Sequence, residues 1–164
     1  MYNLLKRRLI NDLREYGATT IVANRETKEM LNYSFSIDNN GIVPLTREDK
    51  DYVDNKIKEV RNYIDRCKKL LKDDINTRQA IVLFSQLEEL PNCFISIQLL
   101  VRNKKLYCFC NSRSLDVENK LFTDIEVCRK ICKEVCNELN VELEMIKFIV
   151  GSIHYYAKNN KLLA

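Results

Sequence analysis

The sequence predicts an α+β protein in which helices pack against a sheet. Two observations support this fold class. Apolar residues recur at helical spacing in several segments, and runs of strand length that are alternating or wholly apolar lie between and after them. The predicted order is a helix, strands, a helix, a hairpin, a helix and a final strand. At 164 residues, of which 46% are hydrophobic, the chain can bury one core, so we expect a single domain over residues 1–164.

The first quarter of the chain is predicted to contain a helix followed by strands. Residues 3–16 place leucine and isoleucine side chains on one side and charged side chains on the other, which indicates an amphipathic helix. The pattern from Thr19 to Ile37 is that of strands, interrupted by the polar stretch Asn24–Lys28. Asn39–Gly41 is a turn signal.

A long charged helix and a short strand follow. Thr46 is a candidate N-cap, because Asp49 stands three residues later in an arrangement like a capping box. Apolar residues at helical spacing extend this predicted helix to Leu71. Ala80–Phe84 is a short apolar run, which predicts a buried strand.

The second half has the clearest pattern. Cys93–Val101 and Lys104–Asn111 are strand-like runs, and Arg102-Asn103 between them predicts a hairpin turn. Residues 124–139 form the next predicted helix, and Glu142–His154 is the last predicted strand.

Composition and charge favour a protein that binds a small ligand. The formal net charge is +4, and acidic and basic residues alternate instead of forming a basic stripe with interleaved aromatic residues. This balance suits a small anion better than a nucleic acid. No apolar stretch is long enough to cross a bilayer, and the N-terminus lacks the apolar core of a signal peptide. We therefore expect a cytoplasmic protein without a membrane or nucleic-acid partner.

Five of the seven cysteines are interpreted as core residues. No Cys-x-x-Cys pair occurs, and a single histidine cannot complete a repeated Cys/His pattern, so we expect no metal. Cys128, Cys132 and Cys136 recur every four residues and share one helix face, while Cys108 and Cys110 alternate along a strand. Small buried side chains on a core-facing surface, in a reducing compartment, explain this pattern.

A set of polar or reactive side chains lies in, or directly after, the apolar runs of the second half. Such side chains are costly to bury unless a partner or ligand satisfies them. Each also has an ordinary explanation: a cysteine that begins a strand is usually core, arginine and serine are common at solvated strand ends, a lone histidine is usually structural, and Asp124 suits a helix N-cap. We interpret the set as a nucleotide pocket. Its members are Cys93, Arg113, Ser114, Asp116, Asp124, His154 and Tyr156.

The segments around these residues resemble thymidylate synthase and its relatives, the deoxycytidylate hydroxymethylases. The resemblance rests on Leu90–Gln98, Ser112–Val117 and Gly151–Tyr156, and it covers residues 75–157 well and 20–45 weakly. It implies a mixed sheet packed with helices, with the sheet at a homodimer interface. It also implies a pyrimidine deoxynucleoside monophosphate, dCMP or dUMP, as substrate and 5,10-methylenetetrahydrofolate as the one-carbon donor.

The resemblance also implies residue roles. In the family, the cysteine at Cys93 adds to carbon 6 of the pyrimidine and makes carbon 5 nucleophilic. Asp116 matches a position that organises the pocket near the ring, and Gln98 also matches a family position. The family's catalytic glutamate is matched by Glu59, for which an exposed charge on a helix is the alternative interpretation. The matching phosphate ligands are Arg25, Arg78, Arg113 and Ser114, with Arg78 reaching across the dimer interface.

The base and the sugar have their own matching residues. Asp124 lies where thymidylate synthases carry an asparagine, and the deoxycytidylate hydroxymethylases resemble this chain in having aspartate there. A carboxylate accepts from the exocyclic amino group of cytosine, which favours dCMP over dUMP. The His154 and Tyr156 pair matches residues that bind the sugar hydroxyl and favour the deoxyribose form.

The departures from the family concern mainly the folate half of the site. The stretch between Thr46 and Thr77 is shorter than usual, no tryptophan occurs, and little sequence follows Tyr156, where family members continue with a closing segment. Gln79 replaces a phosphate-binding arginine, which weakens the phosphate clamp. Further replacements are Phe94 for a histidine, Lys120 for a glycine and Thr123 for a phenylalanine.

Three functions therefore stay open. The first is transfer of a hydroxymethyl or methyl group to carbon 5 through a Cys93 adduct. The second is a module that sequesters or senses a pyrimidine nucleotide. The third is thiolate-addition chemistry without folate, such as base exchange or glycosidic cleavage.

Overall fold

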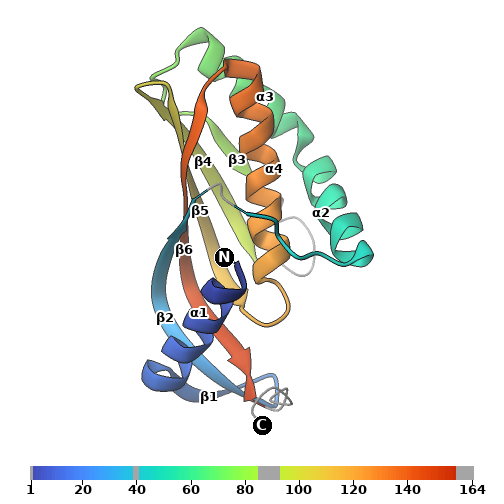
Figure 1. Cartoon of the computed structure of the whole chain (residues 1–164), viewed down its shortest axis with the longest axis vertical. Coiled ribbons are helices and arrows are strands. Elements are labelled where there is room, and N and C mark those ends of the chain that lie inside the picture. Colours follow the sequence, from blue (N-terminus) through green and yellow to red (C-terminus); the bar gives the residue numbers. More distant parts are fainter. Residues whose placement is uncertain (1, 39–40, 85–92, 158–164) are drawn as a thin grey trace.

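The computed structural model describes residues 2–38, 41–84 and 93–157. Within these ranges the chain forms one six-stranded sheet and four helices, arranged as in Figure 1. The elements are α1 (Tyr2–Tyr16), β1 (Ala18–Val22), β2 (Arg25–Ile37), α2 (Arg47–Glu59), α3 (Arg61–Asp73), β3 (Ile81–Leu83), β4 (Phe94–Arg102), β5 (Lys105–Asp116), α4 (Leu121–Leu139) and β6 (Glu142–Tyr156).

The sheet is mixed, as the family resemblance implies. Its strand order is β1-β2-β6-β5-β4-β3, and every neighbouring pair is antiparallel except β5 and β6. Parallel strands need a long crossover connection, and α4 supplies it between β5 and β6. The fold is therefore α+β with helices packed on a mixed sheet.

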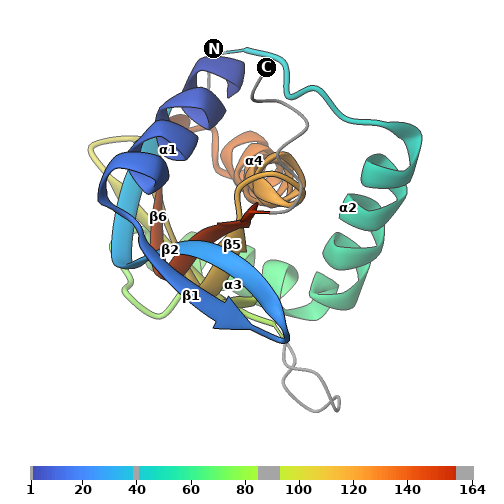
Figure 2. The same cartoon turned by 90° about the horizontal axis from the view of Figure 1, so that it is seen from below.

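The helices gather on one face of the sheet. Viewed from below, α4 lies between α1 and α2 (Figure 2). The Tyr33 hydroxyl on β2 donates to the Asp12 carboxylate on α1 at 2.6 Å. On the other side of α1, the Lys6 ammonium lies 5.2 Å from the centre of the Phe122 ring on α4. These contacts join α1 both to the sheet and to α4.

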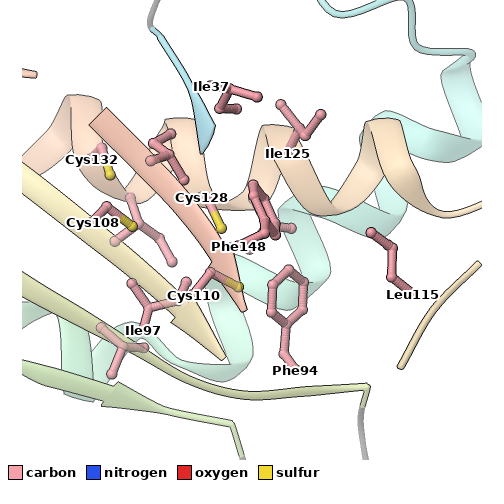
Figure 3. Packing of buried hydrophobic residues seen from close by; sticks show 14 of the residues in the cluster. Ile37, Phe94, Ile97, Cys108, Cys110, Leu115, Ile125, Cys128, Cys132 and Phe148 are labelled. Atoms are coloured by element: carbon pink, nitrogen blue, oxygen red, sulfur yellow. The ribbon is translucent and has the colours of Figure 1, made fainter. Parts of the chain in front are cut away.

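The core between the sheet and α4 contains aromatic rings and sulfur atoms (Figure 3). Phe148 on β6 stacks on Phe35 of β2 with ring centres 4.9 Å apart. The prediction that the paired cysteines of β5 and α4 are core residues is confirmed. Cys108, Cys110, Cys128 and Cys132 are all fully buried, and Cys136 is half-buried.

The opposite face of the sheet carries exposed apolar side chains. Side chains alternate along a strand, so Ile149 points away from the face that Phe148 occupies. Ile149, Ile81 and Leu83 are 37%, 37% and 46% exposed, whereas Val82 between the last two is fully buried. Ala80–Phe84 was predicted as a buried strand, and this is wrong in one respect: β3 is an edge strand with one face uncovered.

The predicted helix to Leu71 is also wrong as a single element. The capping box at Thr46 forms as expected, but the helix ends at Glu59 and a second helix begins at Arg61. Val60 between them has ψ near 12° and is buried. Packing of Val60 into the core redirects the chain, although neither glycine nor proline marks the break.

Two turns lie in slightly different places from those predicted. The strand break expected at Asn24–Lys28 is a tight turn at Ala23 and Asn24, both with positive φ, and β2 begins at Arg25. Such two-residue turns match the twist of a hairpin. The β4–β5 turn likewise uses Asn103 and Lys104. The turn signal at Asn39–Gly41 lies largely outside the described residues.

Phe148→Ala should destabilise the protein strongly. The change removes a buried ring that stacks on Phe35 and leaves a cavity beside α4, which costs about 3–5 kcal/mol. Urea unfolding followed by circular dichroism measures this free energy. Glu142→Ala, at the exposed start of the same strand, is the control and should change it by less than about 0.5 kcal/mol.

Candidate functional site

A cavity of about 550 Å³ lies where α2 and the start of α4 face the ends of β2, β5 and β6. Its wall includes an aromatic ring, a thiol, carboxylates, cations and hydroxyl groups. The lining residues are Val22, Thr27, Glu29, Tyr52, Cys93, Phe94, Arg113, Ser114, Asp116, Lys120, Asp124, Ser152, His154 and Tyr156. A second cavity, of about 600 Å³, lies between α1 and the opposite ends of the same three strands. It is more apolar and contains no nucleophile.

Strand register brings the polar residues of the cavity together. Ser114 and Asp116 on β5 lie opposite Ser152 and His154 on β6. On the other side of β6, Glu29 of β2 is the register partner of His154. Side chains from β2, β5 and β6 therefore lie in one wall of the cavity, although they are far apart in the sequence.

Gly151 lets β6 approach β5 closely at this wall. A Cβ atom at position 151 would stand 2.8 Å from the carbonyl oxygen of Arg113, which is closer than such atoms pack. Any larger residue would therefore push Arg113 away from β6. The glycine of the Gly151–Tyr156 segment thus positions the arginine next to the thiol.

Cys93 presents an exposed sulfur to the cavity. Its carbonyl oxygen accepts a hydrogen bond from the Arg113 amide at 2.9 Å. The Ser114 hydroxyl donates to its sulfur at 3.4 Å. Cys93 is exposed, unlike the buried cysteines of the core. These contacts hold Cys93 beside Arg113 and Ser114 near the end of β5.

Asp116 organises the turn between β5 and α4. Its Oδ1 accepts from the amides of Glu118 and Asn119 at 3.0 and 3.2 Å, and its Oδ2 accepts from the Asn119 side chain at 2.8 Å. The carboxylate therefore holds the loop that leads to α4. Asp116 also lines the cavity.

Asp124 is a buried carboxyl in the first turn of α4. The alternative that it caps this helix is wrong, because α4 begins at Leu121 with Lys120 at the N-cap position. Asp124 is only 3% exposed, and burial raises its pKa from 3.8 to about 7. The Lys120 charge opposes this shift and Asp116 adds to it. A buried acid of this kind, in a cavity wall, is a candidate ligand group.

His154, Tyr156 and Arg25 form a cluster at another part of the wall. The His154 and Tyr156 rings meet edge to face, with centres 5.3 Å apart. The Arg25 guanidinium lies 3.9 Å from the centre of the Tyr156 ring. Arg25 does not itself line the cavity, but it is held at its rim by this stacking.

Besides Arg25, three of the sequence-predicted residues do not line the cavity. Gln98 shares the outer face with Ile81, and its side chain donates to the Arg78 carbonyl at 3.0 Å. Arg78 is exposed just before β3. Glu59 ends α2, where its half-exposed carboxylate pairs with Lys56 at 2.8 Å. The catalytic role of Glu59 and the ligand roles of Arg78 and Gln98 stay predictions.

Sequence reasoning missed some residues of the wall. Tyr52 lies on α2, and burial and the nearby Asp124 and Cys93 charges raise its pKa to about 12. Glu29 accepts a short hydrogen bond from the Ser152 hydroxyl. Glu29 stands in a strand of mixed polarity, and only its register opposite His154 assigns it to the wall.

The described residues give no metal centre and no membrane span. Among residues 2–38, 41–84 and 93–157, histidine, cysteine and acidic side chains do not gather in threes as metal ligands. In the same ranges no helix has the length and apolar character needed to span a bilayer.

An exposed thiol held beside an arginine–serine pair, with a buried carboxyl across the cavity, suits nucleophilic addition to an anionic heterocyclic substrate. The family model described as Thymidylate synthase matches residues 16–164. The chain therefore belongs to the thymidylate synthase family. Its activity in general is transfer of a one-carbon unit to carbon 5 of a pyrimidine nucleotide. Members of the family typically use methylenetetrahydrofolate and are usually dimers. No curated protein sequence matches the chain.

Asp124→Asn should stabilise the folded protein above neutral pH. Because the folded pKa of Asp124, about 7, exceeds the 3.8 of the unfolded chain, its charged form is disfavoured by folding. Stability is therefore lost as pH rises from 3.8 to about 7, the interval between the two pKa values, by an amount on the order of 2–4 kcal/mol in total. Asparagine cannot ionise and escapes this loss.

Urea unfolding at pH 5 and pH 8 measures the effect. The gain from Asp124→Asn should be largest at pH 8 and clearly smaller at pH 5, where only part of the loss has occurred. Asp54→Asn, at an exposed acid of α2 that pairs with Lys130, is the control and should not gain stability at pH 8. A loss of stability at pH 8 in Asp124→Asn would show that its carboxylate is well satisfied.

Proposed function

We propose that the protein transfers a hydroxymethyl or methyl group to carbon 5 of dCMP or dUMP through a covalent Cys93 adduct. The observation that carries this proposal is the exposed Cys93 sulfur, held by Ser114 beside Arg113 in the same cavity as a buried carboxyl. The carboxylate of Asp124 favours dCMP, since it accepts from the 4-amino group of cytosine.

The cavity wall suggests how the nucleotide lies. Arg113 and Ser114 bind the phosphate, because a guanidinium gives two parallel hydrogen bonds and a hydroxyl adds a third. Arg25, stacked at the rim, and Arg78 are further phosphate ligands by family resemblance. His154 and Tyr156 bind the sugar, and Asp124 binds the edge of the base. In this orientation the pyrimidine ring lies next to the Cys93 sulfur.

The chemistry begins at that sulfur. The Cys93 thiolate forms a bond to carbon 6, and the electron pair of the 5,6 double bond moves to carbon 5 and the conjugated position 4. Carbon 5 then becomes the nucleophile: it would bond to the methylene carbon that methylenetetrahydrofolate supplies, while the bond from that carbon to the folate nitrogen breaks. Water taken up by this carbon would give the hydroxymethyl product, and hydride from the reduced folate would give the methyl product. Loss of the carbon 5 proton and breakage of the carbon–sulfur bond restore the double bond and release the thiolate. Asp116 supports this step by holding the loop against the ring.

The α2 wall fits a folate in one respect. Tyr52 presents an aromatic ring on the side of the cavity that faces Cys93 and Asp124, and a flat pterin stacks well on such a ring. Tyr52 is therefore the residue that would hold the cofactor. Methylenetetrahydrofolate, when bound, supplies the carbon at the oxidation level of formaldehyde.

A homodimer built on the outer sheet face would complete the site. Ile81, Leu83 and Ile149 leave an apolar surface there, and a second copy would cover it. Arg78 stands at the edge of that face, with its backbone held by Gln98. Its position supports the expectation that it reaches the site of the partner subunit.

A folate-independent relative is the second candidate function. The observation that favours it is Glu59, whose carboxylate pairs with Lys56 instead of lining the cavity. Without a catalytic glutamate at the ring, the protein would bind a pyrimidine nucleotide as a sequestering or sensing module, or use thiolate addition for other chemistry such as glycosidic cleavage.

Cys93→Ser should abolish release of tritium from dCMP or dUMP labelled at carbon 5. A serine hydroxyl adds to carbon 6 far more slowly than a thiolate, so carbon 5 never loses its label. Scintillation counting of the released water measures the reaction, and the matched control is Cys136→Ser on the half-buried end of the α4 cysteine row.

The wild-type result separates the candidate functions. Release that depends on methylenetetrahydrofolate supports one-carbon transfer, and release without it supports bare thiolate addition. Binding without release supports the module. Equal release by Cys93→Ser and wild type would remove the nucleophile assignment.

Ile149→Asp should convert the dimer to a monomer. The aspartate would place a charge in the apolar face that the second copy covers, without touching the core on the other side of β6. Size-exclusion chromatography with light scattering gives the mass. Leu4→Asp, an exposed apolar position on α1, should leave the dimer intact, and a monomeric wild type would contradict the proposed interface.

A further inference from the structure

Lys120 places a cation in the cavity that the proposed chemistry has not used. It is the N-cap residue of α4, and its ammonium lies 4.3 Å from the centre of the Tyr52 ring. Among the described residues no carboxylate pairs with this ammonium, whereas the Lys56 ammonium on α2 pairs with Glu59. The hydrogen-bond donors of Lys120 are therefore available to a molecule that enters the cavity.

Lys120 and Asp124 form a donor and acceptor pair on one side of α4. They are four residues apart, one helical turn, and the Asp124 amide donates to the Lys120 carbonyl at 2.9 Å. Both line the cavity, together with Tyr52. The positive charge of Lys120 lowers the pKa of Asp124 against the effect of burial. The two side chains are thus close enough for one to set the charge of the other.

This pair matches the hydrogen-bonding edge of cytosine. An ionised carboxylate only accepts hydrogen bonds and an ammonium only donates them. Cytosine offers a donor, its 4-amino group, beside two acceptors, ring nitrogen 3 and oxygen 2. Asp124 can accept from the amino group while Lys120 donates to the neighbouring ring acceptors.

Uracil presents the wrong pattern to the same pair. Its oxygen 4 is an acceptor and would face the Asp124 carboxylate, and its nitrogen 3 carries a hydrogen that would face the Lys120 ammonium. A neutral carboxyl, in contrast, can both donate and accept, so it pairs with either base. Discrimination therefore needs the ionised carboxylate, and a nearby cation adds to it by donating to the ring acceptors of cytosine and by favouring the ionised form of Asp124.

We propose that Lys120 is a base-recognition residue that, together with Asp124, selects cytosine over uracil nucleotides. This inference rests on the proposed binding of a pyrimidine nucleotide in the cavity. It assigns a role to a position where the resembling family carries glycine. It also makes the carboxylate and the ammonium one recognition unit, in which Lys120 strengthens the preference that the Asp124 carboxylate gives.

The test measures the dissociation constants of dCMP and dUMP by isothermal titration calorimetry for wild type and Lys120→Met. Methionine keeps an unbranched apolar side chain and removes the ammonium that lies over the Tyr52 ring, with its charge and donors. Because the two nucleotides share phosphate and sugar, the ratio of their constants isolates the base. We expect Lys120→Met to reduce the preference for dCMP about tenfold or more, with dCMP weakened and dUMP unchanged or tighter.

Two further variants control the result. Lys56→Met removes another ammonium near the Tyr52 ring, 5.8 Å from its centre, and should leave the ratio unchanged. Lys120→Arg keeps the charge and donors and should retain the preference for dCMP. Lys120 is exposed, so its variants should fold, which circular dichroism checks.

Two outcomes would overturn the assignment of Lys120. Equal weakening of both nucleotides by Lys120→Met would mean general attraction of the phosphate, and an unchanged ratio would mean no contact with the base. If wild type binds neither nucleotide, the proposed function itself fails, and that result is distinct from a wild type that binds both without preference.

Discussion

Where β6 passes β5, the Arg113 carbonyl lies against Gly151 so closely that a Cβ atom there would stand 2.8 Å away. This approach holds Arg113 in place, and the Arg113 amide in turn holds the carbonyl of Cys93 at 2.9 Å. Ser114 then reaches the sulfur. The positions of Cys93, Arg113 and Ser114 therefore depend on one close contact between β5 and β6. These two strands are parallel, and the long crossover through α4 makes that arrangement possible.

The same sheet separates two environments. One face packs aromatic rings and sulfur against α4, and Phe148 and Cys110 contribute no polar atoms that would need water. At the ends of β2, β5 and β6 the side chains become polar and the cavity opens. Asp124 is the exception, because it keeps an ionisable group almost fully buried. A carboxyl held at a cost in stability, at a cavity wall, is typical of a functional rather than a structural residue.

Periodicity predicted most of the fold, and the misses have identifiable physical causes. The hairpin and the α4 cysteine row could be predicted because side-chain alternation and helical spacing leave direct marks in the sequence. The break at Val60 could not, because it arises from packing of that side chain into the core. The start of α4 was placed too late, since Lys120 at its N-cap makes no side-chain cap bond that a pattern would reveal. In the site, Cys93 and His154 could be predicted because the segments around them resemble a known family. Tyr52 and Glu29 could not, because only the fold brings them to the cavity wall.

The distribution of sulfur has a practical consequence. Cys93 faces solvent, whereas the sulfurs of Cys108, Cys110, Cys128 and Cys132 are sealed in the core. An alkylating reagent applied to the folded chain therefore reaches Cys93 first and the half-buried Cys136 more slowly, and additions at the fully buried thiols report molecules that have unfolded. The adduct at Cys93 therefore reports whether the pocket is occupied, and adducts at the buried thiols report global unfolding.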